Sequence, residues 1–176
     1  MFPGHSVLQV PVPQLEGFVR ARTIHHDPSY LAEDPAFVHA HVTALGPFVD
    51  DLTEDVERRV AAIAADTAPF DFVLARIGRF GDGTLHLLPE PDGGFRRLTE
   101  RLAAEFPEHP RYAGQFADVL PHLTVDLLSA DVTEESTLAL LGDAIPARCR
   151  AERLELVWYE PGATGVRRSW RLGWRA

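Results

Sequence analysis

The chain has 176 residues, of which 45% are hydrophobic and 24% charged, so we expect a folded protein with a sizeable core and exclude a disordered chain. Its formal net charge of −9 disfavours a grip on long nucleic acids, because binding to the phosphate backbone needs a basic surface. All 17 basic residues are arginine, which excludes a lysine Schiff base and the lysine of a P-loop.

Strand-like and helical patterns alternate through the first half of the chain. A weak period-two alternation ending in prolines predicts a strand over 5–13, and apolar residues at helical spacing predict a helix over 14–23. A loop rich in turn-forming residues follows at 25–35, and FVHAHVTAL predicts a strand over 37–45. Thr53 is placed to cap the next helix, whose first turn carries three acidic residues.

The second half continues this alternation. The patterns predict strands over 70–81, 84–91, 119–128, 153–161 and 167–175, with helices over 95–106 and 133–144. In the last strand, period two places Trp170, Leu172 and Trp174 together on an apolar face. The order strand, helix, histidine-bearing strand, helix recurs, which indicates internal duplication in an α+β fold. Since no linker interrupts the pattern, we expect a single domain spanning residues 1–176.

Features of the ends and of the single cysteine bear on where the protein acts. No apolar run reaches the ~20 residues of a membrane-spanning helix, and the N-terminus lacks the pattern of a signal peptide. We therefore expect a soluble, cytoplasmic protein with no membrane partner. Cys149 has no disulfide partner and is expected to be a small buried apolar residue.

The stretch FVHAHVTALGPF, residues 37–48, places two histidines one residue apart in an apolar run. Three interpretations are open: a metal clamp made by His39 and His41, two structural histidines, or a catalytic pairing of His41 with Thr43. The metal interpretation is disfavoured because no carboxylate or cysteine stands at a suitable spacing to complete a zinc site, so we expect no metal. His39 is expected to be structural or to contact substrate at the edge of a cleft.

A second copy of the His-x-Thr pattern favours the catalytic interpretation. His41-Val42-Thr43-Ala44 and His122-Leu123-Thr124-Val125 lie 81 residues apart, each in a predicted strand. In a strand, each threonine shares a face with its histidine. Two imidazoles on opposite sides of a phosphorus atom can act as general base and general acid, while the hydroxyls donate to the non-bridging oxygens.

These motifs resemble the paired signature of the 2H phosphoesterase superfamily, which includes 2′-5′ RNA ligase-like proteins and cyclic phosphodiesterases. HVTALGPF, GRFGDGTLHLLPEPDGGFRRLTERL and PHLTVDLL also look like its bacterial members, so the resemblance covers most of residues 5–160. It implies two lobes related by a pseudo-twofold axis, each a mainly antiparallel sheet with helices on its outer side, around a central cleft. It further implies catalysis without metal or cofactor, with His41 and His122 as the acid–base pair and Thr43 and Thr124 as phosphate ligands.

The activity that this resemblance implies is hydrolysis of a 2′,3′-cyclic or related phosphate, on a nucleotide or short RNA end, to a phosphomonoester. The acidic composition and the absence of an evident basic, aromatic-rich surface favour a small nucleotide over a long RNA. A binding module that holds a nucleotide or a partner protein on the same scaffold, without turnover, is the alternative. The substrate, the assignment of base and acid, and the oligomeric state stay open.

Four further residues have two interpretations each. Phe48 and Phe80, next to turns, stack a nucleobase or belong to the core. His86 lines the cleft or is an exposed strand residue. Asp126 shares the face of His122 and either orients a histidine or contacts solvent at the end of its strand. We retain Phe48, His86 and His39 as candidate substrate contacts.

Overall fold

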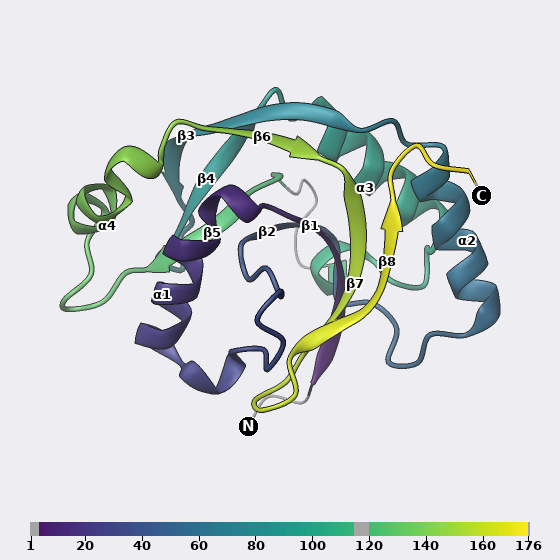
Figure 1. The fold of residues 1–176 in the computed structure, drawn as a ribbon, viewed down its shortest axis with the longest axis horizontal. Coiled ribbons are helices and arrows are strands. Elements are labelled where there is room, and N and C mark those ends of the chain that lie inside the picture. Colours follow the sequence, from purple (N-terminus) through teal and green to yellow (C-terminus); the bar gives the residue numbers. More distant parts are fainter. Residues whose placement is uncertain (1–3, 115–119, 176) are drawn as a thin grey trace.

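The protein folds around two four-stranded antiparallel sheets, shown in Figure 1 for a computed structural model that describes residues 4–114 and 120–175. The first sheet has the order β2-β1-β7-β8 and contains β1 (His5–Pro11), β2 (His41–Leu45), β7 (Arg153–Tyr159) and β8 (Gly165–Arg171). The second has the order β5-β4-β3-β6 and contains β3 (Phe70–Arg79), β4 (Thr84–Glu90), β5 (Leu123–Leu127) and β6 (Ala147–Ala151).

The two sheets have equivalent arrangements, which confirms the expected pair of α+β lobes. In each sheet the strand of one His-x-Thr motif lies at an edge, β2 in the first and β5 in the second. The other edges are β8 and β6. Only Glu152 separates β6 from β7, so the chain passes directly from one sheet into the other, along the arc at the top of Figure 1.

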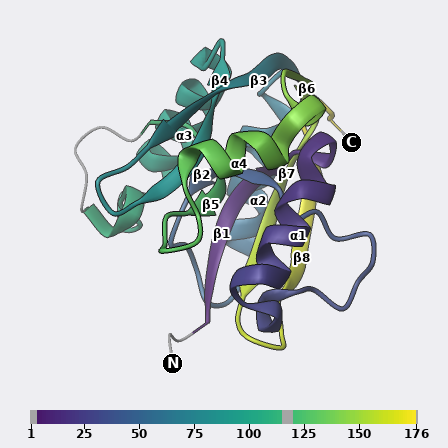
Figure 2. The same cartoon turned by 90° about the vertical axis from the view of Figure 1, so that its left-hand side faces the viewer.

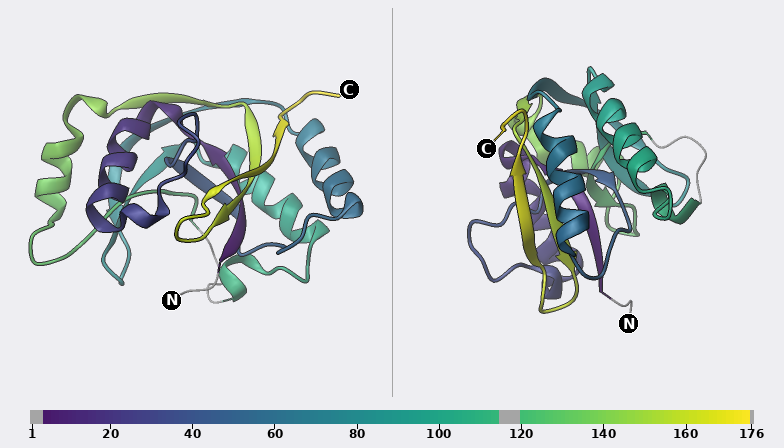
Figure 3. Two further views of the ribbon diagram at one scale, coloured as in Figure 1. Left: turned by 60° about the horizontal axis from the view of Figure 1, so that its bottom comes forward. Right: turned by 90° about the vertical axis from the view of Figure 1, so that its right-hand side faces the viewer.

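Four α-helices cover the sheets, and four short 3₁₀ helices complete the described elements. The α-helices are α1 (Glu16–His26), α2 (Glu54–Ala65), α3 (Gly93–Glu105) and α4 (Glu134–Leu141). The 3₁₀ helices are η1 (Pro13–Leu15), η2 (Pro28–Tyr30), η3 (Arg111–Gly114) and η4 (Gly142–Ala144). Figure 2 shows α1 and α4 together on one side of the molecule, and Figure 3 shows α2 and α3 together on the opposite side.

The helices after the two inner strands cross over to the other motif strand. α1 follows β1 in the first sheet but contacts β5 of the second. α3 follows β4 in the second sheet but contacts β2 of the first. Since β2 and β5 also contact each other, the two lobes interlock at the motif strands.

Local sequence explains where these helices begin. α2 has Thr53 as its N-cap, whose hydroxyl accepts from the backbone N–H of Val56 at 3.3 Å, and its first turn is acidic as predicted. α4 begins with a capping box between Thr133 and Ser136, in which each side chain accepts from the other residue's backbone N–H. These caps satisfy N–H groups that have no partner within the helix.

The core is apolar and aromatic where α3 covers the second sheet. Phe95 of α3 is 1% exposed, and its ring lies 4.9 Å from the rings of both Phe70 and Phe72 in β3. Cys149 of β6 is buried as expected, and burial raises the pKa of its thiol to about 11. None of the described helices is long and apolar enough to cross a membrane.

Several predicted boundaries are wrong. Residues 37–40 are not a strand, since β2 begins at His41. The strand predicted over 119–128 begins only at Leu123, so His122 precedes it, and residue 119 lies outside the described residues. α1 continues to His26 rather than ending at 23, because the first strong helix-breaking signal is the dipeptide Asp27-Pro28. β6 was not predicted, because its buried residues are the small side chains of Ala147, Cys149 and Ala151, which give a weak apolar signal.

The last strand is also shorter than predicted. β8 ends at Arg171, and the expected apolar face breaks down because Trp174 is 58% exposed. Leu172 is buried as expected.

Replacing Phe95 with alanine should lower the free energy of unfolding by about 3–5 kcal/mol, because the change leaves a cavity among three packed rings. Urea denaturation followed by circular dichroism measures the loss. Leu140→Ala on the solvent side of α4 is the matched control and should change the free energy by less than about 1 kcal/mol, since Leu140 is 61% exposed. Equal losses in the two variants would contradict the assignment of Phe95 to the core.

Candidate active site

Each motif histidine is held by a backbone carbonyl two residues earlier, in the segment that leads into its motif strand. Nδ1 of His41 lies 2.7 Å from the carbonyl oxygen of His39, and Nδ1 of His122 lies 2.8 Å from the carbonyl oxygen of Leu120. A carbonyl oxygen can only accept, so Nδ1 must be the donor in both rings. In the neutral form of each imidazole, Nε2 therefore carries the lone pair and is the atom that can take up a proton.

Tyr159 of β7 packs against His41 and connects it to Gln9 of β1 in the first sheet. The two rings have centroids 5.6 Å apart, and the tyrosine oxygen is 3.2 Å from His41 Nδ1. The tyrosine hydroxyl donates to Gln9 Oε1 at 2.6 Å, and Gln9 is fully buried opposite Thr43 in the β1–β2 register. Tyr159 and Gln9 are thus neighbours of the motif that sequence reasoning missed, because they come from distant strands.

Phe80 and His86 pack beside His122. The Phe80 and His86 rings stack with centroids 4.0 Å apart, and they lie 4.8 and 5.4 Å from the His122 ring respectively. His86 is 2% exposed, so it is not the exposed strand residue of one interpretation. The stack requires glycine at position 78, because a Cβ there would lie 2.6 Å from His86 Nε2.

The two motif histidines differ in their electrostatic surroundings. Burial is the main cause that lowers the pKa of His41, to about 4, and the nearby His122 and His39 lower it further, against the His39 carbonyl and Glu16. Burial also lowers the pKa of His122 below 6.5, but the Leu120 carbonyl and the Asp82 carboxylate favour its protonated form. His41 is therefore a neutral base at pH 7, while His122 has an anionic neighbour that favours its acid form.

The two threonines of the motifs lie at two adjoining cavities. Thr43 lies with His41 in a cavity of about 400 Å³ that is also lined by His5, Tyr30, Pro47 and Tyr159. Thr124 is exposed and lines a cavity of about 360 Å³, together with Arg22, His26, Tyr30 and Asp126. Because Tyr30 lines both cavities, it stands between the two motif threonines. Tyr30 carried no sequence signal beyond its position in a turn-rich loop.

Two of the candidate substrate contacts lie elsewhere. Phe48 is 6% exposed and packs in the core, with its ring 5.0 Å from Phe106 and 5.1 Å from His109. His39 is 7% exposed, with Nδ1 2.7 Å from Glu16 Oε1 and Nε2 accepting from the Ala32 backbone at 3.3 Å. Both nitrogens of His39 are engaged within the protein, which leaves neither for a metal or a ligand.

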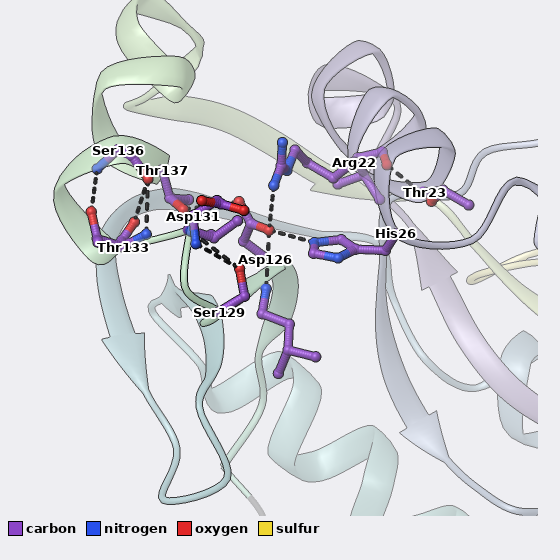
Figure 4. Close-up of polar contacts among 12 residues, drawn as sticks. Arg22, Thr23, His26, Asp126, Ser129, Asp131, Thr133, Ser136 and Thr137 are labelled. Carbon is purple, nitrogen blue, oxygen red and sulfur yellow. Dashed lines mark hydrogen bonds and ion pairs between the residues drawn. The ribbon is translucent and has the colours of Figure 1, made fainter.

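Asp126 is 3% exposed and contacts helices, as Figure 4 shows, so its interpretation as a solvent contact is wrong. One carboxylate oxygen lies 2.9 Å from Arg22 Nη2, 2.7 Å from His26 Nε2 and 3.0 Å from the Leu127 backbone nitrogen. The other oxygen accepts from the Thr137 hydroxyl at 2.9 Å. The histidine that Asp126 holds is thus His26 of α1, which the local pattern had placed in a loop.

The charged side chains near the site do not form an evident metal centre. Within residues 4–114 and 120–175, no three His, Cys, Asp or Glu side chains are grouped so as to hold a metal ion.

Comparisons with known proteins agree with this arrangement. The model of the 2′-5′ RNA ligase superfamily matches residues 11–163. TT0787 of Thermus thermophilus is similar in structure, with a TM-score of 0.66 at 21% identity, over 96% of this chain and 98% of that one. LigT of E. coli complexed with 3′-AMP gives a TM-score of 0.60 at 16% identity, over 97% and 99%. At these identities the structures show a shared fold. Curated protein sequences gave no match.

The ring of His41 should titrate with a midpoint near pH 4, well below the usual 6.5, because burial disfavours its charged form. Histidine side-chain NMR over pH 3–8 measures the midpoint, and the resonance is assigned by its loss in His41→Asn. The expected Nδ1–H tautomer gives a distinct ¹⁵N shift pattern at neutral pH. A midpoint near 6.5, or a neutral ring protonated on Nε2, would contradict the environment described for His41.

Proposed function

The chain belongs to the 2′-5′ RNA ligase superfamily, and on this premise we propose that it is a metal-independent phosphodiesterase that opens a cyclic phosphate on a nucleotide or a short RNA end. The product is a phosphomonoester. The observation that carries the proposal is the equivalence of the two motif histidines. They lie at adjoining sheet edges, and each has Nδ1 bound to a carbonyl two residues earlier.

In the proposed reaction His41 is the general base. Its Nε2 takes a proton from water as the water oxygen attacks phosphorus. His122 in its protonated form gives a proton to the departing ribose oxygen as the P–O bond breaks. The hydroxyls of Thr43 and Thr124 donate to the non-bridging phosphate oxygens, where negative charge increases. The proton taken by His41 and the proton lost by His122 balance, so exchange with solvent restores both histidines.

The residues that line the two cavities suggest which part of a nucleotide each cavity would hold. The eight residues that line the His41 cavity are uncharged when histidine is neutral, and aromatic rings of His5, Tyr30 and Tyr159 contribute to it. Such a site suits the base and ribose of a nucleotide, through stacking. The Thr124 cavity carries Arg22 and His26 together with Asp27 and Asp126, and it suits a polar continuation of the substrate. Structures of E. coli LigT complexed with 3′-AMP, ATP and NADP+ show that this neighbour binds nucleotides.

A binding module on the same scaffold remains the alternative from another class. It would need neither a neutral imidazole at His41 nor a second imidazole near an acidic residue. Two imidazoles held in the same way, but with different electrostatic surroundings, therefore favour the enzyme. Turnover measurements separate the two functions.

Purified protein treated with EDTA should hydrolyse at least one member of a panel of 2′,3′-cyclic mononucleotides, ADP-ribose cyclic phosphate, cyclic dinucleotides and RNA ends with a cyclic phosphate. His41→Asn and His122→Asn should each lower kcat by about 10²–10⁴-fold, because each removes a proton-transfer group. Thr43→Val or Thr124→Val should cost on the order of 10²-fold by removing a donor to the phosphate. Chromatography of substrate and phosphomonoester product measures the rates.

His109→Asn is the matched control, since His109 packs on Phe48 in the core and lines neither cavity; it should keep wild-type kcat. Nucleotide binding without turnover of any substrate would establish the binding module instead.

The pH profile of kcat/KM should be bell-shaped with its optimum between about 4 and 6.5. Activity falls as pH drops through the pKa of His41, about 4, because the base becomes protonated. It falls as pH rises through the pKa of His122, which is lowered from 6.5, because the acid loses its proton. The profile of kcat should lie at higher pH, since a bound phosphate anion favours both protonated imidazoles. An optimum of kcat/KM above pH 7 would contradict these roles.

A further inference from the structure

Helix α1 is bonded at its first turn to the segment that leads into the first motif strand. Glu16 Oε2 accepts from the backbone N–H of His39 at 2.6 Å and of Ala40 at 3.0 Å. Glu16 Oε1 lies 2.7 Å from His39 Nδ1. The same carboxylate thus holds both the backbone and the ring of His39, whose carbonyl oxygen accepts from His41 Nδ1.

The far end of α1 is bonded to the second motif strand. Arg22 and His26, one turn apart, both contact Asp126 of β5, which is 3% exposed (Figure 4). Burial raises the pKa of Asp126, but hydrogen bonds from His26, Arg22 and Thr137 outweigh it and hold the pKa below 3.8. The carboxylate is therefore ionised at neutral pH and also binds α4 through Thr137.

These contacts act close to both histidines. Glu16 accepts from the backbone N–H of Ala40, and this N–H belongs to the same peptide group as the His39 carbonyl that orients His41. Asp126 lies two residues beyond Thr124 in β5 and four beyond His122 in the chain. Between Glu16 and His26 the helix rises roughly 15 Å, at about 1.5 Å per residue. α1 thereby spans the distance between the two motif segments and fixes one against the other.

Stability alone is a poor explanation of these buried charges. An ion pair that is taken out of water gains little over apolar residues of similar volume, and its better-attested role is to specify one arrangement. The place of Asp126 in the first motif strand is held by Leu45, which packs in the core at 1% exposure. An apolar residue is therefore compatible with the equivalent strand position, yet the second strand carries a charge bonded to α1.

We propose that α1 is a spacer that sets the separation and mutual orientation of His41 and His122, with Glu16 and Asp126 as positioning residues at its two ends. Glu16 lines neither cavity, and although Asp126 lines the Thr124 cavity, both of its carboxylate oxygens are bonded within the protein. The kinetic consequence of this role rests on the proposed function. The structural consequence does not, because a spacer transmits a change at one end to the other whether or not the site turns over.

The kinetic test is a double-mutant cycle of Glu16→Gln and Asp126→Asn with the best substrate of the wild-type protein. If α1 acts as one spacer, releasing either end misplaces the histidines. Each variant should then lower kcat at least about tenfold with little change in KM, and the double variant should be no worse than about threefold below the poorer single. Losses that multiply would show two independent local roles and overturn the proposal.

The second readout needs no substrate. Histidine side-chain NMR of each variant should show a changed resonance for the histidine at the far end: His41 in Asp126→Asn and His122 in Glu16→Gln. A far histidine that is unmoved in both variants overturns the proposal. A wild-type protein without turnover defeats the proposed function alone, because this measurement still decides the role of α1.

Matched variants separate positioning from folding. Asp55→Asn removes an acidic partner of Arg58 and Arg59 on the exposed face of α2, and it should leave kcat and both histidine resonances as in the wild type. Should Asp126→Asn fail to fold, His26→Gln weakens the same end of the spacer and takes its place in the cycle. All variants are compared at a temperature at which circular dichroism shows each to be folded.

Discussion

Both motif histidines donate Nδ1–H to a backbone carbonyl two residues earlier, and the chemistry proposed for the site depends on this bond. A ring held by this bond cannot turn to bring the wrong nitrogen to the substrate. The orientation of each Nε2 then depends on the position of one backbone carbonyl. The fold must therefore hold the two backbone segments at a fixed distance and orientation. The carbonyls of His39 and Leu120 lie within three residues of the start of β2 and β5, so the packed sheets limit how far these carbonyls can move.

The two lobes are held together by helices that pack on the opposite sheet. Each motif strand lies at an edge, where one side has no strand partner and can face the other lobe. α1 and α3 then pack on the motif strand of the opposite sheet, and β6 runs almost directly into β7. The lobes are consequently joined by several segments rather than by one hinge, and their interlocking keeps the two histidines at a defined separation.

The two halves are equivalent in backbone but differ in charge. In the first half, burial lowers the pKa of His41 to about 4, although Glu16 opposes this shift. In the second half, burial also lowers the pKa of His122, and Asp82 opposes it. The contacts at the two ends of α1 also differ. At one end the carboxylate belongs to the helix, as Glu16, and at the other it belongs to the strand, as Asp126. A duplicated scaffold that becomes unsymmetrical in this way can give one imidazole the role of base and the other that of acid.

Local sequence patterns predicted the α+β class, most helices and strands, and the two His-x-Thr motifs. These features depend on residues that are close together in the chain, which is what periodicity and capping residues reveal. The motif pair could be interpreted from spacing alone, since one residue between histidine and threonine places both on one face of a strand.

Local patterns could not predict contacts between segments that are distant in the sequence. Tyr30, Tyr159 and Gln9 reach the site only through tertiary packing, and Phe48 is removed from it for the same reason. His39 and Asp126 looked like parts of the motifs because they lie beside them in the chain, yet both are bound to α1. The sequence by itself determined which groups can do the chemistry. Only the tertiary structure decided which of their neighbours hold them, because hydrogen bonds between residues 100 positions apart leave no trace in local spacing.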